Sequence, residues 1–341
     1  MILEKDREFK KQLNFERQKA RISQCIWGQY QPNTCEGKII KAHSIQRSKI
    51  LKKISNNGLI KTLELITENG NLMTNFENVG IKKFSTFNGF CGKHDKEIFQ
   101  PIENKLFNGE LEQKYIYAYR AITKEYHTIK ESIYITDNQL TKAINDKKNE
   151  LKLKLEIKLF QSAISIIELE DIIKFFQDNI INKNFNGIKH HHIILEQEYP
   201  IACCSIFIPY YDFLGNSLFS EEEKQQMALN PTNLNDSKYL FVNIFPENGK
   251  TNILISYFKN QKKRYKFLNK LLKIDINKLK IAISDMMINY IENIAFSPKY
   301  IEDKFSEKET DLIKKNFIRS IIDSDNFNRL NLNLFRDNKN V

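Results

Sequence analysis

Four residues that can bind a metal ion constrain the fold of this chain most strongly. Cys91 and His94 are separated by two residues in the stretch NGFCGKHDKEIFQPIE, which predicts that both lie at the start of a short helix that Pro101 ends. Cys25 and Cys35 bracket a loop whose Gly, Pro and Asn residues let a backbone curve around an ion. Zinc needs four N or S ligands in a tetrahedron. We therefore predict a closed structural Zn²⁺ site with these four ligands.

The two ligand pairs differ in how specific their spacing is. Cys25 and Cys35 are farther apart in sequence than the members of most zinc-binding pairs. The alternative interpretation is a set of buried thiols with a helix-capping histidine. Zinc is favoured because all three cysteines of the N-terminal half fall into the pattern. A small unit with few large apolar residues also gains the most folding stability from an ion that joins its parts.

The composition is typical of a globular protein. The 341 residues include 24 Phe and 41% apolar residues, enough to fill the cores of about two domains. The N-terminus is charged from its fourth residue and lacks the apolar core of a signal peptide, and no uncharged apolar run reaches the ~20 residues that cross a bilayer. Five cysteines without an export signal favour metal binding or burial over disulfides. We expect a cytoplasmic protein with no membrane partner.

Basic residues are concentrated in two blocks of a chain whose net charge is +11. Residues 37–62 and residues 259–273 each contain seven Lys or Arg and no acid. Such blocks indicate a polyanion, above all nucleic acid, as the partner. The second block also fits a helix with an apolar stripe and a solvated Lys face. The candidate phosphate-binding residues are Lys41, Arg47 and Lys49 in the first block and Lys262, Lys263 and Arg264 in the second.

Hydrophobic periodicity predicts an α+β protein of two domains. Residues 1–105 are expected to hold a charged helix up to about residue 24, a short strand, a basic helix and an alternating strand. Residues 106–341 are expected to form a mostly helical domain with a small antiparallel sheet, which includes a hairpin turning at Asn248 and Gly249. The boundary near residue 105 is placed by the change of pattern alone.

Two polar residues are candidates for catalysis. His43 ends the short apolar strand inside the first basic block, where a neutral imidazole can take a proton from water. A core or capping histidine is the alternative. Asp95, next to His94, offers a hard oxygen ligand to an ion such as Mg²⁺ or Mn²⁺. A divalent ion beside a general base is what phosphodiester hydrolysis needs.

Residues 25–100 resemble the treble-clef zinc unit of the HNH endonucleases. The resemblance rests on the two early cysteines, on AHSI around His43, and on FCGKHD at a helix start. It implies that His43 is the general base and that Cys91 and His94 are a zinc pair, although the family usually has Cys where this chain has His94. It also implies that Asp95, where the family usually has His, binds the catalytic ion. Asn88 is the candidate for the middle Asn of the family.

These observations lead to two main hypotheses about function, beside a third interpretation as a structural protein with no nucleic-acid role. The first is metal-dependent cleavage of DNA or RNA by a protein with structural Zn²⁺ and catalytic Mg²⁺ or Mn²⁺. The same motifs resemble those of bacterial proteins of undefined activity, which implies a setting in defence against phage. The second hypothesis is a catalytically inactive zinc module that binds nucleic acid or protein, with the C-terminal domain as sensor or scaffold. A protein partner or a homo-oligomer is compatible with both.

Overall fold

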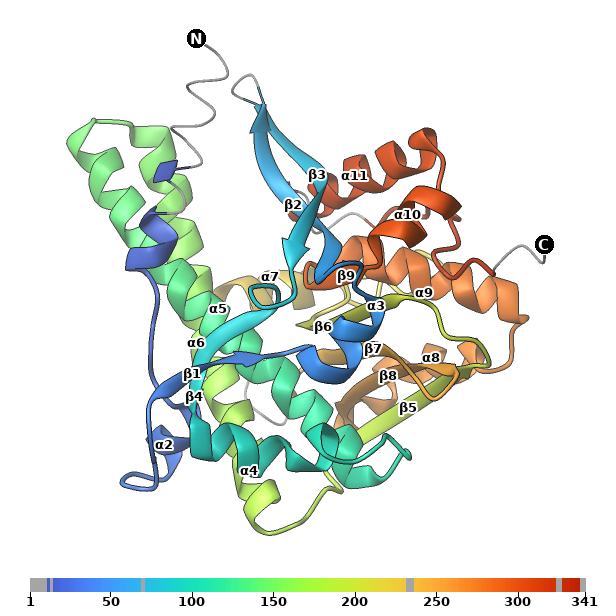
Figure 1. The fold of residues 1–341 in the computed structure, drawn as a ribbon. Helices are drawn as coiled ribbons and strands as arrows, with labels where there is room; N and C mark the ends of the chain where they lie inside the picture. Colours follow the sequence, from blue (N-terminus) through green and yellow to red (C-terminus); the bar gives the residue numbers. More distant parts are fainter. Residues whose placement is uncertain (1–10, 13–14, 69–70, 231–235, 323–326, 338–341) are drawn as a thin grey trace.

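The structure, a computed structural model, describes residues 11–12, 15–68, 71–230, 236–322 and 327–337. It is a mixed α+β protein with antiparallel sheets, as the sequence predicts (Figure 1). The charged helix expected up to about residue 24 lies partly outside the described residues, and residues 15–19 are helical. In the described ranges no helix is long and apolar enough to cross a membrane.

A two-stranded sheet and a helix form the N-terminal unit. Strand β1 (Ile39–His43) pairs antiparallel with β4 (Thr86–Cys91), and His43 lies opposite Thr86. Helix α4 (Gly92–Glu103) follows β4 directly, with Cys91 as its N-cap. The short helix α2 (Ile26–Tyr30) precedes β1 in the segment that the sequence predicts to be a loop. The unit therefore has the order short helix, strand, strand, helix.

A larger sheet of seven strands occupies the centre of the molecule. Its order is β3-β2-β9-β6-β7-β8-β5, and all neighbours are antiparallel. The strands are β2 (Leu59–Glu68), β3 (Asn71–Gly80), β5 (Ile188–Leu195), β6 (Ile201–Phe207), β7 (Leu240–Glu247), β8 (Lys250–Phe258) and β9 (Ile294–Phe296). The hairpin β7–β8 turns at Asn248 and Gly249, whose φ angles of 56° and 76° fit the predicted turn.

Helices cover both faces of this sheet. The two long helices α5 (Leu111–Asn145) and α6 (Asn149–Ile181) pack on one face together with the β1–β4 unit. The other face carries α8 (Leu268–Leu271), α9 (Ile276–Tyr290), α10 (Pro298–Lys304) and α11 (Glu307–Ile322). Neighbouring residues of one strand enter different cores because side chains alternate along it. Cys204 and Phe241 lie in the first core, and Cys203 and Val242 in the second.

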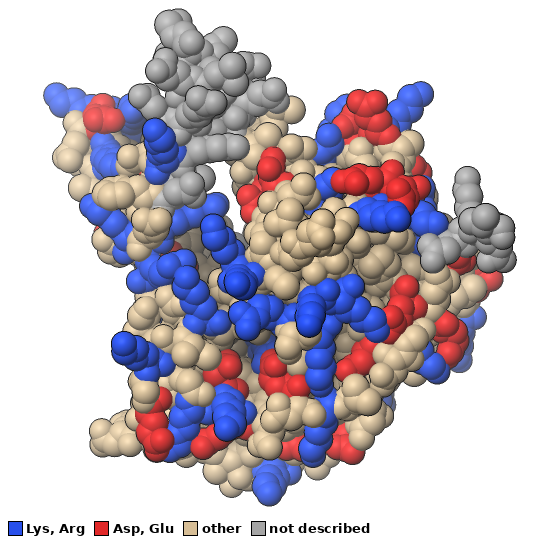
Figure 2. Space-filling view, in the orientation of Figure 1, with Lys and Arg blue, Asp and Glu red and all other residues tan. Residues whose placement is uncertain are grey.

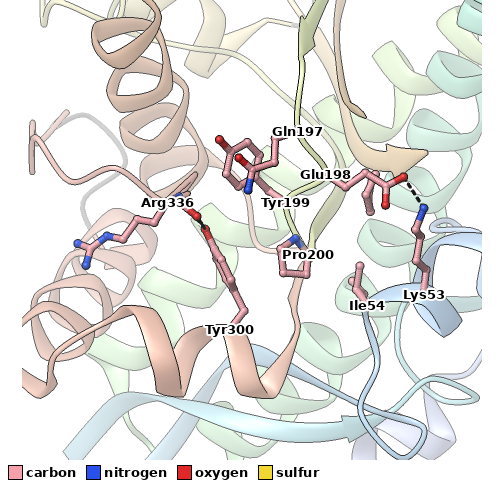
Figure 3. Close-up of a pocket in the computed structure, with 9 residues that line it drawn as sticks. Lys53, Ile54, Gln197, Glu198, Tyr199, Pro200, Tyr300 and Arg336 are labelled. Atoms are coloured by element: carbon pink, nitrogen blue, oxygen red, sulfur yellow. Dashed lines mark hydrogen bonds and ion pairs between the residues drawn. The ribbon is translucent and has the colours of Figure 1, made fainter. Parts of the chain in front are cut away.

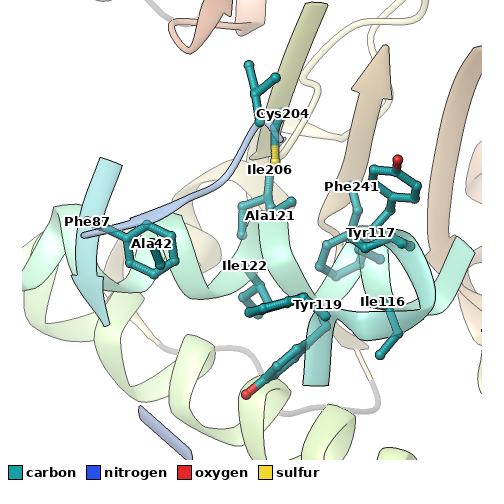
Figure 4. Close-up of a cluster of buried hydrophobic side chains, with 14 of the residues drawn as sticks. Ala42, Phe87, Ile116, Tyr117, Tyr119, Ala121, Ile122, Cys204, Ile206 and Phe241 are labelled. Atoms are coloured by element: carbon teal, nitrogen blue, oxygen red, sulfur yellow. The ribbon is translucent and has the colours of Figure 1, made fainter. Parts of the chain in front are cut away.

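The first core extends across residue 105, where the sequence predicts a domain boundary. Figure 4 shows Ala42 and Phe87 of the β1–β4 unit in the same cluster as Tyr119 of α5 and Phe241 of the sheet. Strands β2 and β3 also precede residue 105 and yet pair with the sheet through β9. Aromatic side chains of α5 pack against the β1–β4 unit and also against the large sheet. The N-terminal unit therefore shares this core and has no separate one.

The predicted basic helix in the first block is present as one continuous helical segment, η1 (Arg47–Leu51, a π-helix) followed directly by α3 (Lys52–Ile54). Two other local predictions from the sequence differ from the structure. Helix α4 contains Pro101 and continues to Glu103. The second block is broken into η3 (Lys259–Lys262), η4 (Arg264–Phe267) and α8, because Tyr265 is non-helical and its buried hydroxyl donates a hydrogen bond to the carbonyl of Lys238.

Phe90 is predicted to be a major contributor to stability. It is fully buried and contacts the rings of Phe87, Phe99 and Tyr119, so it joins β4 to α4 and α5. We expect Phe90→Ala to lower the free energy of unfolding by about 3–5 kcal/mol, measured by urea titration. Leu72→Ala, at a side chain that is 48% exposed, is the control. Equal effects of the two substitutions would contradict this packing.

Candidate metal centre and basic surface

The four predicted zinc ligands converge on one point. The sulfur atoms of Cys25, Cys91 and Cys35 lie 3.2, 3.4 and 3.7 Å from Nδ1 of His94. All four ligand atoms are within 4.8 Å of one another. A tetrahedral Zn²⁺ with ordinary Zn–S and Zn–N bonds places sulfur and nitrogen ligands about 3.5 Å apart. The donor set and its spacing therefore fit a Cys₃His metal site.

Local structure positions each ligand. Cys25 is the N-cap of α2, and its sulfur accepts a hydrogen bond from the backbone N–H of Gly28 at 3.4 Å. Cys91 ends β4, and His94 points back towards it from the first turn of α4. Cys25, Cys91 and His94 are buried, whereas Cys35 lies in an exposed loop. An ion at this point joins the segment before β1 to the start of α4.

The electrostatics of the ligands also favour a cation. Burial, together with the nearby sulfurs of Cys25 and Cys91, raises the pKa of Cys35 to about 12. Burial also acts to raise the pKa of Cys91, but backbone N–H donors of His94 and Glu36 outweigh it and the pKa is lowered. Three thiolates this close repel each other unless a positive charge lies between them. A divalent cation supplies that charge and lets all three ionise.

His43 has the geometry of a neutral base. It is half-buried, and its Nε2 lies 3.0 Å from the carbonyl oxygen of Ile81. If Nε2 donates its proton to that oxygen, Nδ1 keeps a free lone pair. Burial lowers the pKa of His43, and Arg47 and Arg120 lower it further, against the opposing effect of the Ile81 carbonyl. The ring is therefore uncharged near pH 7.

The other two catalytic candidates have separate surroundings. Asp95 is half-buried in the first turn of α4, and burial raises its pKa despite the nearby charge of Arg120. Asn88 donates a hydrogen bond to Oγ of Ser23. No hydrogen bond joins His43, Asp95 and Asn88 to one another in the described part of the chain. There, the Cys₃His group is also the one cluster of three or more metal-binding side chains.

A buried ion pair, which the sequence interpretation missed, lies near both His43 and Asp95. Arg120 is 2% exposed and donates to Glu103 at 2.6 Å, with its guanidinium 4.2 Å from the centre of the Phe99 ring. Arg120 lowers the pKa values of both His43 and Asp95, and Glu103 raises both. The available signal was a single charged residue inside the apolar run YIYAYRAI of α5, because a charge in such a run is buried and needs a partner.

Part of the first basic block forms an exposed strip with its neighbours. We call Lys41, Arg47, Lys52, Lys82 and Lys83 the basic strip: all five are exposed, and none forms an ion pair in the described ranges. Lys49 is half-buried and donates to the carbonyl of Lys105. Figure 2 shows Lys and Arg side chains gathered in a band across the middle of the molecule, over β1 and α3. The strip begins beside the His43 ring, because Lys41 lies on the same strand two residues before His43 and Arg47 begins η1 four residues after it.

The second basic block is a weaker candidate surface. Lys262 and Lys263 are exposed. Arg264, by contrast, donates to Glu223 and to the carbonyl of Leu218, and it stacks on Phe219. Tyr265 is fully buried, so it offers no ring to a base. This block follows β8, near the sheet edge opposite to β3.

A hollow of about 250 Å³ opens beside α3 (Figure 3). Lys53, Tyr199, Tyr300 and Arg336 contribute to its lining. Its charged side chains are already paired: Lys53 with Glu198, and Arg336 with Glu309. The hollow therefore presents no unpaired charge to a ligand, and it does not define the function.

No protein-family model, no curated protein and no solved structure matches the chain. The interpretation of the site depends on the contacts and charges described above.

The spacing at Gly28 gives a test of the metal centre. A Cβ atom at Gly28 would lie 2.2 Å from Sγ of Cys35, so Gly28→Ala must displace a ligand. We expect this variant to bind zinc at least tenfold more weakly, measured by competition with a chromophoric chelator. Gly92→Ala is the control, because a Cβ atom there meets only Ile40, at 3.8 Å. Zinc affinity that is unchanged in Gly28→Ala would contradict the ligand set.

Proposed function

We propose that the protein binds nucleic acid along the basic strip and cleaves its phosphodiester backbone with His43 as general base. The observation that carries the proposal is the position of a half-buried, neutral imidazole beside unpaired basic side chains, on a unit that also carries the Cys₃His cluster. Basic side chains without acidic partners attract phosphates and release counterions on binding. A neutral imidazole takes a proton from the attacking water.

The order of elements supports an HNH-type, treble-clef interpretation of this unit. Two ligands come from the segment before β1, the strand pair β1–β4 follows, and two ligands come from the start of α4. His43 ends the first strand of that pair. A bound Mg²⁺ or Mn²⁺ supplies charge neutralisation at the phosphate and at the leaving oxygen. Asp95 is the nearest carboxylate to the zinc pair in sequence and is the residue we assign to hold that ion.

A binding-only function is the second candidate, and one observation favours it. In the described ranges Asp95 belongs to no cluster of three or more metal-binding side chains, so it has few protein partners with which to hold a hard cation. The basic strip retains its affinity for phosphates in that case. Binding without cleavage then distinguishes an inactive zinc module from a nuclease.

His43→Ala is expected to abolish cleavage without loss of zinc or of binding. The loss should be on the order of 10²–10⁴-fold, since a general base is removed, while the four zinc ligands remain. The measurement is cleavage of plasmid, single-stranded DNA and RNA in Mg²⁺ or Mn²⁺, with zinc content and salt-dependent retention on the same substrates. His192→Ala, which removes a half-buried imidazole from β5, is the matched control. Cleavage that persists in His43→Ala rules out the assigned base.

The pH dependence of cleavage follows from the lowered pKa of His43. A base works in its deprotonated form, so activity is lost as pH falls through the pKa. Because that pKa lies below the ordinary histidine value of about 6.5, we expect the rate to hold down to pH ~6.5 and to fall only in more acidic buffer. Initial rates across the pH range, with DNA binding measured in parallel, test this. A rate that already declines between about pH 8 and 7 argues against this histidine as the base.

A further inference from the structure

Cys35 differs from the other three residues of the Cys₃His group in its exposure. Cys25 is 5% exposed, His94 is 3% exposed and Cys91 is fully buried, whereas Cys35 lies at the surface. A thiol that binds zinc is deprotonated, and oxidants react fastest with exposed thiolates that have a second thiol nearby. The exposed sulfur of Cys35 is therefore the point at which a dissolved oxidant reaches the group.

The segment that carries Cys35 can change its conformation while the strands stay in place. Residues 31–38 lie between α2 and β1 and contain neither helix nor strand. Glu36, the next residue after Cys35, pairs with Lys93 of α4, but its carboxylate is 73% exposed. Exposed ion pairs hold a segment only weakly. The sulfur of Cys35 is thus the most mobile of the three in the group.

Cys25 is the thiol best placed to react with an oxidised Cys35. Their sulfurs lie within 4.8 Å of each other, and a disulfide needs about 2 Å, a difference that a loop without regular structure can close. A Cβ atom at Gly28 would lie 2.2 Å from Sγ of Cys35 and 3.7 Å from Sγ of Cys25, so the missing side chain leaves Cys35 room beside Cys25. Cys91, by contrast, is held between its pairing with Ile39 and the start of α4.

We propose that Cys35 is a site of oxidation by hydroperoxides, that Cys25 converts the oxidised Cys35 into a disulfide, and that the metal ion is released. The Cys35 thiolate attacks the peroxide, the O–O bond breaks, and Cys35 becomes a sulfenic acid. The Cys25 thiolate then attacks the sulfenic sulfur, forms the S–S bond and expels hydroxide. The two sulfurs lose two electrons, which hydrogen peroxide accepts with two protons to give two water molecules. Zinc keeps its oxidation state.

The disulfide does not replace the connection that the ion makes. It takes away two of the four ligands, and Cys91 and His94 alone hold zinc far more weakly than a closed tetrahedral set. It also joins two residues of the same segment, so it leaves the segment before β1 unconnected to the start of α4. The inference requires the metal centre and does not depend on the proposed nuclease function.

The first test treats the full-length, zinc-loaded protein with hydrogen peroxide and follows zinc release with a chromophoric chelator. Peptide mass spectrometry, after free thiols are blocked, locates the disulfide. We expect one zinc ion released for each Cys25–Cys35 disulfide formed, and dithiothreitol with added zinc should restore the site. Cys203 and Cys204, both 2% exposed, are internal controls and should stay reduced. Zinc and thiols that persist in peroxide, a disulfide to Cys91, or a disulfide between two copies overturns the proposal.

A ligand exchange separates the exposure of Cys35 from general instability of the site. Cys35→His keeps a zinc-binding side chain at this position but removes the exposed thiolate, so zinc release by peroxide should be at least tenfold slower than in the wild type. Cys203→Ala, which removes a thiol from the second core, is the control and should release zinc at the wild-type rate. Equal release rates in Cys35→His and the wild type, or equally slow release in Cys203→Ala, overturn the assignment.

Discussion

Three cysteine sulfurs and one imidazole nitrogen lie within 4.8 Å of each other, and the three thiols can ionise together only if a cation lies among them. The convergence of these four groups constrains how the N-terminal unit is built. The unit takes two candidate ligands from the segment around α2 and two from the junction of β4 and α4, so an ion at this point would join the segment before β1 to the end of β4, at the end of the pair where Ile39 lies opposite Cys91. The apolar part of the same unit has no core of its own and packs against α5 and the large sheet. The metal centre and this shared core therefore hold β1 in place.

The position of β1 determines the position of the candidate chemistry. His43 ends the strand, and the basic strip begins on it at Lys41 and continues into η1 and α3. The carbonyl of Ile81, at the start of the β3–β4 connection, lies 3.0 Å from Nε2 of the imidazole and holds the ring in place. The buried ion pair between Arg120 of α5 and Glu103 of α4 places two fixed charges near the His43 imidazole. Loss of the metal ion should therefore affect the proposed active residue although no ligand touches it.

The sequence predicted the parts of the site that depend on local spacing. Cys91 and His94 are two residues apart at a helix start, and this spacing alone brings their donor atoms together. Cys25 and Cys35 could be added because few other ligands were available. The hairpin at Asn248 and Gly249 was also predictable, since turn chemistry is a local signal. Arg120 and Glu103 were missed because their pairing depends on how α5 crosses α4, which no local pattern encodes.

Long-range pairing explains the remaining differences. Strand β2 alternates like a half-buried strand, but its partner β9 is three residues long and about 230 residues away, so the sequence gives no signal that they meet. The second basic block was interpreted as a helix because its leucines are helically spaced. Burial of Tyr265, which that spacing does not describe, breaks it into short turns.

X-ray absorption at the zinc edge of the purified protein tests the central claim most directly. The account predicts one zinc per chain with three sulfur ligands at about 2.3 Å and one nitrogen at about 2.0 Å. A protein without zinc, or a zinc with only nitrogen and oxygen neighbours, would contradict it.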